Sequence, residues 1–248
     1  MSNVLDNHGR GERFSRWMQH SPTSTATPLD ALWSPHRLTV PSDLWGIIEQ
    51  LGLDALAYAE TQRHRMPTLD AVAATFACAD GCASCCELPV LVTLPEVVVA
   101  VAYAGDPTNS VPGRCTDLPD GLETTLRKTR DAYRAITPAT IDTLRTPCPL
   151  LDDGSCSIYD ARPLPCRGWH SLDVEPCKGH NVRHSSTPDI PQYLSYRLLF
   201  TSTQRALATG LQRRGFQPMV YLAQGLSTLM SPARDGALER WQAGGSIV

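Results

Sequence analysis

The sequence predicts a mainly α-helical protein whose helices pack around an irregular, cysteine-rich centre that contains a small hairpin. Three observations support this fold class. Apolar residues recur at helical spacing both before and after the middle of the chain. Residues 146–178 are rich in Pro, Gly, Asp and Cys and lack a helical period, and all nine cysteines lie between Cys78 and Cys177. With 248 residues, of which 42% are hydrophobic, the chain can bury a core.

The N-terminal third predicts an arm followed by short helices. Residues 1–41 are rich in Ser, Thr, Pro, His and Arg, and we expect them to form a mobile N-terminal arm. Ser42 is a plausible N-cap, and helical spacing then follows at Leu44, Ile47, Ile48 and Leu51. Gly52 is expected to end this first helix, with further short helices over 53–63 and 68–76. Together, residues 42–77 form a helical lead-in to the first cysteines.

The middle of the chain predicts further helices. Thr93 and Glu96 have the spacing of a capping box, and Pro95 falls in the first turn of a helix over 93–104. A loop over 105–113, a helix over 122–136 and a short helix over 138–144 are expected to follow.

The last segments predict a hairpin and then a cysteine-free helical region. Asp153 and Gly154 favour a tight turn, with Ser157 to Tyr159 as its returning strand. Helices are expected over 190–211 and 218–230. We therefore divide the chain into the arm (1–41), the helical lead-in (42–77), a cysteine-cluster metal-binding domain (78–178) and a C-terminal helical region (179–248).

Charge and hydropathy exclude two classes of protein. The net charge is −3 and the pI about 6.1, which argues against a nucleic-acid binder with a basic footprint. The first 20 residues have no apolar core of a signal peptide, and Thr93, Pro95 and Glu96 interrupt the longest apolar stretch, so we expect no membrane association. The expected compartment is the cytoplasm, where clustered cysteines are metal or redox ligands rather than disulfides.

The cysteines form two groups and one outlier. Four lie within nine residues, in a C-x3-C-x2-C-C run that includes Gly81, and four more lie beside turn-forming residues further on. Soft thiolates select zinc or iron–sulfur clusters over magnesium or calcium. Burial as small apolar side chains is the alternative, and we favour it only for Cys115. The predicted metal ligands are Cys78, Cys82, Cys85, Cys86, Cys148, Cys156, Cys166 and Cys177.

Both groups resemble a known family. The C-x3-C-x2-C-C run, the LVTLPE segment from Leu91, CPLL from Cys148 and GSCSIYDARPLPCRGW from Gly154 are similar to the YkgJ-like cysteine-cluster family. The resemblance covers roughly residues 76–178. It implies a zinc- or iron-chelating domain whose ligands include the seven cysteines other than Cys177, with Cys177 as the closing member. One branch resembles flagellin lysine N-methylases, thought to use an iron–sulfur cluster with S-adenosylmethionine.

Several residues near the cysteines have two open interpretations. Arg162 and Arg167 flank Cys166, where guanidinium groups would offset the charge of a thiolate-bound cofactor. Alternatively, Arg162 caps a turn and pairs with Asp160. His170 and His180 have ligand chemistry, but solvated or structural roles are more usual for such histidines.

The sequence predicts a metal-binding protein that holds an iron–sulfur cluster, preferred over zinc, in a redox or accessory role. The alternatives are a cluster-dependent group-transfer enzyme, such as a protein methylase that uses S-adenosylmethionine, and a structural zinc module that presents a partner-binding surface. The expected partner is a redox or other protein that the sequence does not identify. No P-loop, G-x-S-x-G or H-E-x-x-H motif is present, so hydrolase and nucleotide-binding functions have no sequence support.

Overall fold

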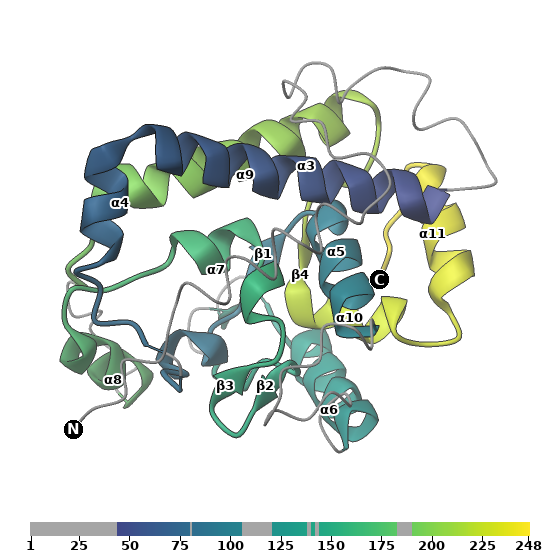
Figure 1. Ribbon diagram of the computed structural model, residues 1–248. Helices are drawn as coiled ribbons and strands as arrows, with labels where there is room; N and C mark the ends of the chain where they lie inside the picture. The colour runs from purple at the N-terminus through teal and green to yellow at the C-terminus, as the bar shows by residue number, and fades with distance from the viewer. Residues whose placement is uncertain (1–43, 80, 106–120, 138–139, 142–143, 183–189) are drawn as a thin grey trace.

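The computed structural model describes residues 44–79, 81–105, 121–137, 140–141, 144–182 and 190–248 (Figure 1). The expected arm, the Ser42 N-cap, the loop over 106–113, Cys115 and most of the short helix predicted over 138–144 lie outside these residues. Within the described ranges the protein is mainly helical, as predicted, and has two small antiparallel sheets, of which the hairpin was expected. No helix there is both long and apolar enough to cross a bilayer.

The first described helix, α3 (Leu44–Arg65), runs without a break through Gly52. The prediction that Gly52 ends a helix is therefore wrong. Gly52 is buried where α3 packs on α5 (Leu94–Gly105), and a Cβ atom there would lie 2.5 Å from the Pro95 carbonyl oxygen. The glycine is used for close helix packing rather than for termination.

We expect Gly52→Ala to destabilise the protein. The new methyl group would lie 2.5 Å from a backbone oxygen and 2.7 Å from Val99 Cγ2, so the two helices must move apart. Overpacking of this kind costs about 1–3 kcal/mol, which lowers the melting temperature by roughly 2–10 °C in a chain of this size. Gly105→Ala is the matched control, because no contact within 4 Å of its Cβ position is found among the residues that the structure describes. Equal melting temperatures for the two variants would contradict this packing argument.

The two longest helices, α3 and α9 (Leu194–Arg213), pack against each other along one side of the molecule (Figure 1). Helix α4 (Pro67–Ala73) confirms the third predicted helix of the lead-in and leads the chain toward the cysteine region. Residues from α3, α5, α9 and the C-terminal segments share one hydrophobic core, whose largest fully buried side chains include Phe200, Leu207 and Trp241.

The capping box predicted at the start of α5 is present in modified form. Glu96 accepts hydrogen bonds from the Thr93 backbone N–H at 2.7 Å and from the Thr93 hydroxyl at 2.8 Å. The Glu96 backbone N–H donates to the Thr93 carbonyl rather than to its hydroxyl. The box therefore fixes the N-terminus of α5, as the spacing predicts.

The C-terminal region has elements that the periodicity did not predict. Strand β4 (Val220–Tyr221) pairs with β1 (Leu91–Val92) and leads directly into α10 (Leu222–Leu229). Helix α11 (Arg234–Gln242) follows and buries Ala237, Leu238 and Trp241. A two-residue strand pair between segments about 130 residues apart has no local sequence signal.

The cysteine region contains the predicted hairpin with a different register. Strands β2 (Leu151–Asp152) and β3 (Ser155–Cys156) pair across Asp153 and Gly154, which both have positive φ. The returning strand is thus Ser155–Cys156, and the prediction of Ser157 to Tyr159 was wrong.

Short helices occur in the segment where the sequence shows no helical period. They are the 3-10 helix η5 (Tyr159–Ala161) and the α-helices α7 (Leu164–Gly168) and α8 (Val174–Val182). A further 3-10 helix, η2 (Ser84–Glu87), lies in the first cysteine group. The segment is therefore less irregular than predicted, because helices this short do not establish a periodic pattern. Helix α6 (Leu122–Arg134), predicted over 122–136, packs against α10 below this region (Figure 1).

Candidate metal centre

A cavity of about 260 Å³ lies among the short elements of the cysteine region. Its wall includes six thiols from four separate segments: Cys82, Cys85, Cys86, Cys148, Cys156 and Cys166. Gly81, Leu91 and Pro147 also line it and are exposed, so the cavity reaches the surface. The fold thus brings together cysteines that lie up to 84 positions apart in the chain.

Backbone contacts fasten the two cysteine groups to each other. The Cys148 N–H donates to the Cys86 carbonyl at 2.8 Å, and the Thr146 N–H donates to the Glu87 carbonyl at 3.0 Å. The hairpin turn lies beside the first group, since a Cβ on Gly154 would sit 3.7 Å from the Gly81 carbonyl oxygen. These contacts hold η2 and the hairpin together in one cavity wall.

Cys78 and Cys177 lie beside this cavity rather than in its wall. The Cys78 sulfur accepts a hydrogen bond from the Ser171 backbone N–H at 3.3 Å. Cys177 is in α8, which packs against η2. All eight described cysteines are free thiols, as predicted for ligands rather than disulfides. Their assignment as metal ligands remains a prediction.

The thiols influence one another electrostatically, which shows that they are close. A hydrogen bond from the Cys86 thiol, aided by the Arg162 charge and opposed by burial, lowers the pKa of Cys85 to about 7. The same hydrogen bond raises the pKa of Cys86, and burial adds to the effect. Burial, and then the Cys156 charge, raises the pKa of Cys148 to about 12. Binding a metal as thiolates would therefore release protons from this site.

The sulfur atoms surround the cavity without converging on one point. Among the described residues, no group of three or more Cys, His, Asp or Glu side chains is arranged to hold a single metal ion. A tetrahedral zinc site requires four donors at about 2.0–2.3 Å from a common centre. Six thiols spaced around 260 Å³ instead leave room for a group of several atoms. The soft donor set fits a thiolate-bound metal group.

Arg162 supplies positive charge to this cavity. Its guanidinium lies over the Tyr159 ring, 3.6 Å from the ring centroid, and its Nε donates to the Tyr159 carbonyl at 3.0 Å. The side chain lines the cavity and interacts electrostatically with the thiols of Cys156, Cys166 and Cys85. The hydrogen bond from Arg162 to the Tyr159 carbonyl caps a turn, as the alternative interpretation expects, and the Asp160 carbonyl accepts a hydrogen bond from Arg167.

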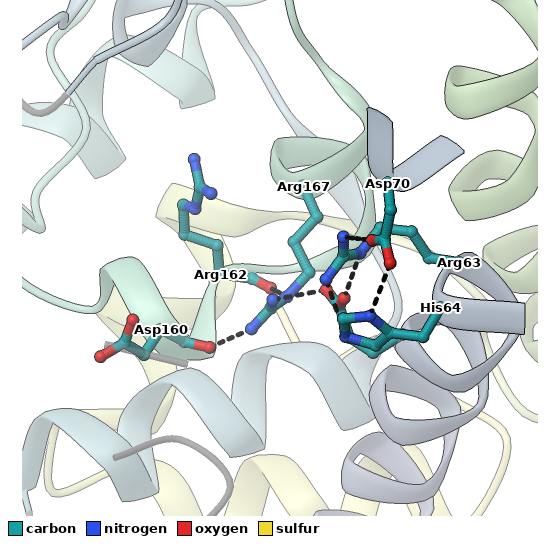
Figure 2. Close-up of polar contacts among 7 residues, drawn as sticks. Arg63, His64, Asp70, Asp160, Arg162 and Arg167 are labelled. Atoms are coloured by element: carbon teal, nitrogen blue, oxygen red, sulfur yellow. Dashed lines mark hydrogen bonds and ion pairs between the residues drawn. The ribbon is translucent and has the colours of Figure 1, made fainter. Parts of the chain in front are cut away.

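Arg167 lies outside the described cavity wall and connects elements of the fold. Its guanidinium donates to Glu60 of α3 at 2.8 Å, to the Arg162 carbonyl at 2.8 Å and to the Asp160 carbonyl. Figure 2 shows the Arg162 guanidinium pointing away from the Arg167 guanidinium and its partners. Arg63 extends this set of contacts through its ion pair with Glu60. Burial opposes ionisation of Glu60, but Arg167 and Arg63 outweigh it and lower its pKa. These contacts of Arg167 position α7 against α3, and its predicted cofactor role remains a prediction.

Of the two histidines considered as possible metal ligands, the structure describes the side chain of one. His170 is buried, and its Nε2 accepts from the Tyr193 N–H at 2.8 Å, so its Nδ1 donates to the Gly168 carbonyl at 2.9 Å. Its ring also stacks on Phe76 at 4.1 Å between centroids. Both nitrogens are therefore used in the fold. The side chain of His180 lies outside the described part of the structure.

Part of the cavity wall was not predicted from the sequence. The lining also includes the apolar side chains of Val90, Leu91 and Leu222, together with Tyr133 and Arg197. Arg197 lies over the Trp169 ring, 4.8 Å from the centroid. Among the described lining residues there is no Asp, Glu or Lys, so thiols, phenols and two guanidinium groups are the ionisable groups of the wall. Tyr133, Arg197 and Leu222 come from α6, α9 and α10, and Leu91 is in β1, whose pairing with β4 brings the start of α10 to the cavity.

Residues 77–181 match the model of the CxxCxxCC family, described as a putative zinc- or iron-chelating domain. The match confirms the resemblance to a cysteine-cluster family over the segment that carries all eight described cysteines. It supports metal binding in general. No curated protein and no solved structure matches the chain significantly.

Proposed function

We propose, from the premise that residues 77–181 form a cysteine-cluster domain of this family, that the protein binds an iron–sulfur cluster and serves a redox or accessory role. One observation carries the choice of a cluster over a zinc ion. Six thiols line a single cavity of about 260 Å³, more than the four thiolates that one tetrahedral zinc ion takes. Fe–S clusters are held by cysteine thiolates, usually four per cluster.

The chain supplies the other features that a buried, anionic thiolate group needs. Arg162 places a positive charge beside three of the thiols. Val90, Leu222 and Tyr133 add apolar surface to the cavity wall, which limits access of water. When bound, a cluster supplies one-electron transfer. The exposed lining residues Gly81 and Leu91 leave an edge at which a redox partner could approach.

Reductive titration of the anaerobically reconstituted protein tests this function. We expect sulfur-to-iron charge-transfer absorption in the visible range that bleaches on addition of dithionite and returns on reoxidation, with an electron paramagnetic resonance signal in one of the two states. A protein that takes up zinc under the same conditions and shows no reducible chromophore would contradict the proposed redox role.

We expect Arg162→Gln to lower the midpoint potential of the bound cluster. Removing a positive charge beside the thiolates disfavours the reduced, more negative state, by on the order of 50–100 mV. Arg205→Gln is the control, because Arg205 lies exposed on α9 and does not line the cavity. Spectroelectrochemical titration of both variants gives the comparison. Equal midpoint potentials for the two variants would show that the Arg162 charge does not act on the cofactor.

A further inference from the structure

The solvent-exposed face of α9 carries large apolar side chains. Leu194 is 65% exposed and Leu198 is 49% exposed, and their spacing places them one turn apart on the same face of the helix. Thr201 continues this face by one more turn and lines the cavity, as does Arg197. The apolar face of α9 therefore leads to the edge of the cavity.

A third exposed leucine lies beside α9. Leu91 is 45% exposed and lines the cavity, and its carbonyl accepts a hydrogen bond from the Gln204 side chain of α9 at 3.0 Å. Among the large hydrophobic residues that the structure describes, three of the four with the highest exposed fractions are thus on or beside this helix. We call the surface formed by Leu91, Leu194 and Leu198 the α9 patch. Exposed apolar side chains that gather in this way mark interaction sites, whereas isolated ones are common on any protein surface.

Positive charge borders the α9 patch. Helix α9 has no acidic residue, and its charged side chains are all arginines: Arg197, Arg205 and Arg213. Arg205 is exposed and lies on the same face as Leu198, two turns further along. The cavity adds the Arg162 guanidinium, and Glu96, which accepts a hydrogen bond from Gln204, is buried and does not reach this surface. An apolar surface with a positive rim is complementary to the surface of an acidic protein.

We propose that the α9 patch docks an acidic electron-carrier protein that exchanges electrons with the group bound in the cavity. This inference rests on the proposed function and adds the chemistry of its partner. In each encounter the reduced carrier loses one electron, the oxidised cluster gains it, and no covalent bond forms or breaks. Leu91 belongs both to the patch and to the cavity wall, so a carrier docked here lies at the edge of the cluster site. Redox encounters bury little area, typically less than about 1,200 Å², which suits a patch of this kind.

An anionic membrane surface fits these observations less well. Recognition of anionic lipids by charge takes a cluster of about four to eight Lys or Arg residues. Helix α9 has three arginines and no lysine, which is fewer than this number. A membrane would also leave unexplained why the patch continues into the wall of a thiol-lined cavity.

Binding of an acidic [2Fe–2S] ferredoxin to the full-length, cluster-loaded protein tests the docking surface. Fluorescence anisotropy of the labelled ferredoxin gives Kd at low and at high salt, and we expect Kd to rise at least about tenfold between about 20 and 300 mM NaCl. Leu198→Glu should raise Kd at low salt at least about tenfold, because it replaces an apolar contact by a charge that repels an acidic partner. Arg205→Glu should raise it at least about fivefold without changing the midpoint potential of the cluster, because Arg205 does not line the cavity.

Two control variants make the same chemical changes outside the patch. Val248→Glu matches Leu198→Glu, since Val248 is 52% exposed at the C-terminus, and Arg240→Glu on α11 matches Arg205→Glu. Absence of ferredoxin binding at low salt, or equal Kd values for Leu198→Glu and Val248→Glu, would overturn the proposal. Co-sedimentation with phosphatidylserine vesicles, or dimers in sedimentation velocity, would overturn it too if Leu198→Glu abolished either, because the patch would then have another occupant. A protein without a reducible chromophore would contradict the proposed function, whereas a reducible protein that does not bind the ferredoxin would contradict the docking surface alone.

Discussion

Replacing Cys156 by serine is expected to remove most of the iron bound to the protein and to lower its solubility. Cys156 ends the returning strand of the hairpin and lines the cavity, where its thiol interacts with those of Cys148, Cys86 and Cys166. Loss of one thiolate leaves the other ligands buried as protonated thiols or as unpaired charges. In small metal-binding domains the free energy of metal binding is also folding free energy.

The measurement is iron and acid-labile sulfide per chain, together with the soluble fraction after expression. We expect retention below about a fifth of the wild-type iron content, because thiolate-to-alcohol changes weaken soft-metal binding severely. Cys115→Ser is the control, as the one cysteine predicted not to be a ligand. If the Cys156→Ser variant binds as much iron as the wild type, the assignment of Cys156 as a metal ligand is wrong.

Glu96→Ala is expected to cause the second large effect, a loss of about 2–4 kcal/mol in the free energy of unfolding. The buried Glu96 carboxylate accepts from the Thr93 N–H and hydroxyl, from Gln204 at 3.1 Å and from the Leu164 N–H at 2.8 Å. Burial raises the pKa of Glu96, and these donors oppose the shift. Its removal leaves two buried backbone N–H groups without this acceptor, each worth about 1–3 kcal/mol.

The same change should loosen the cavity, because Leu164 is the first residue of α7, the helix that carries Cys166. Chemical denaturation and iron retention during dialysis are therefore both measured. Glu123→Ala, at an exposed position in the first turn of α6, is the matched control. Glu96→Gln keeps an acceptor and should fall between wild type and Glu96→Ala. Equal stability of the Glu96→Ala and Glu123→Ala variants would show that Glu96 does not fasten α7.

Local sequence rules predicted those parts of the fold that local interactions determine. The Thr93 and Glu96 pair predicted the start of α5, and Asp153 with Gly154 predicted the hairpin turn, because both features depend on residues a few positions apart. The clustering of all nine cysteines between Cys78 and Cys177 likewise indicated the segment that contains the candidate metal centre.

Tertiary contacts account for the features that the sequence did not predict. A glycine such as Gly52 is typical of a helix end, but here helix α3 continues through it. The reason is tertiary, because the Pro95 backbone of α5 packs too closely against this position for a side chain. The Arg167 guanidinium pairs with Glu60, 107 positions away, although its proximity to Cys166 suggested a role at the cofactor. The positions of Leu91 and Leu222 in the cavity wall depend on the pairing of β1 with β4, which two-residue strands cannot signal locally.

Iron, acid-labile sulfide and zinc per chain, measured after anaerobic purification under reducing conditions, test the central claim most directly. The cavity walled by six thiols predicts iron and sulfide in near-equal amounts, with the cysteine thiols protected from alkylation until the cluster is destroyed by acid. Zinc in place of iron, with no sulfide, would contradict the iron–sulfur proposal, and a chain that contains neither metal would contradict metal binding by these cysteines altogether.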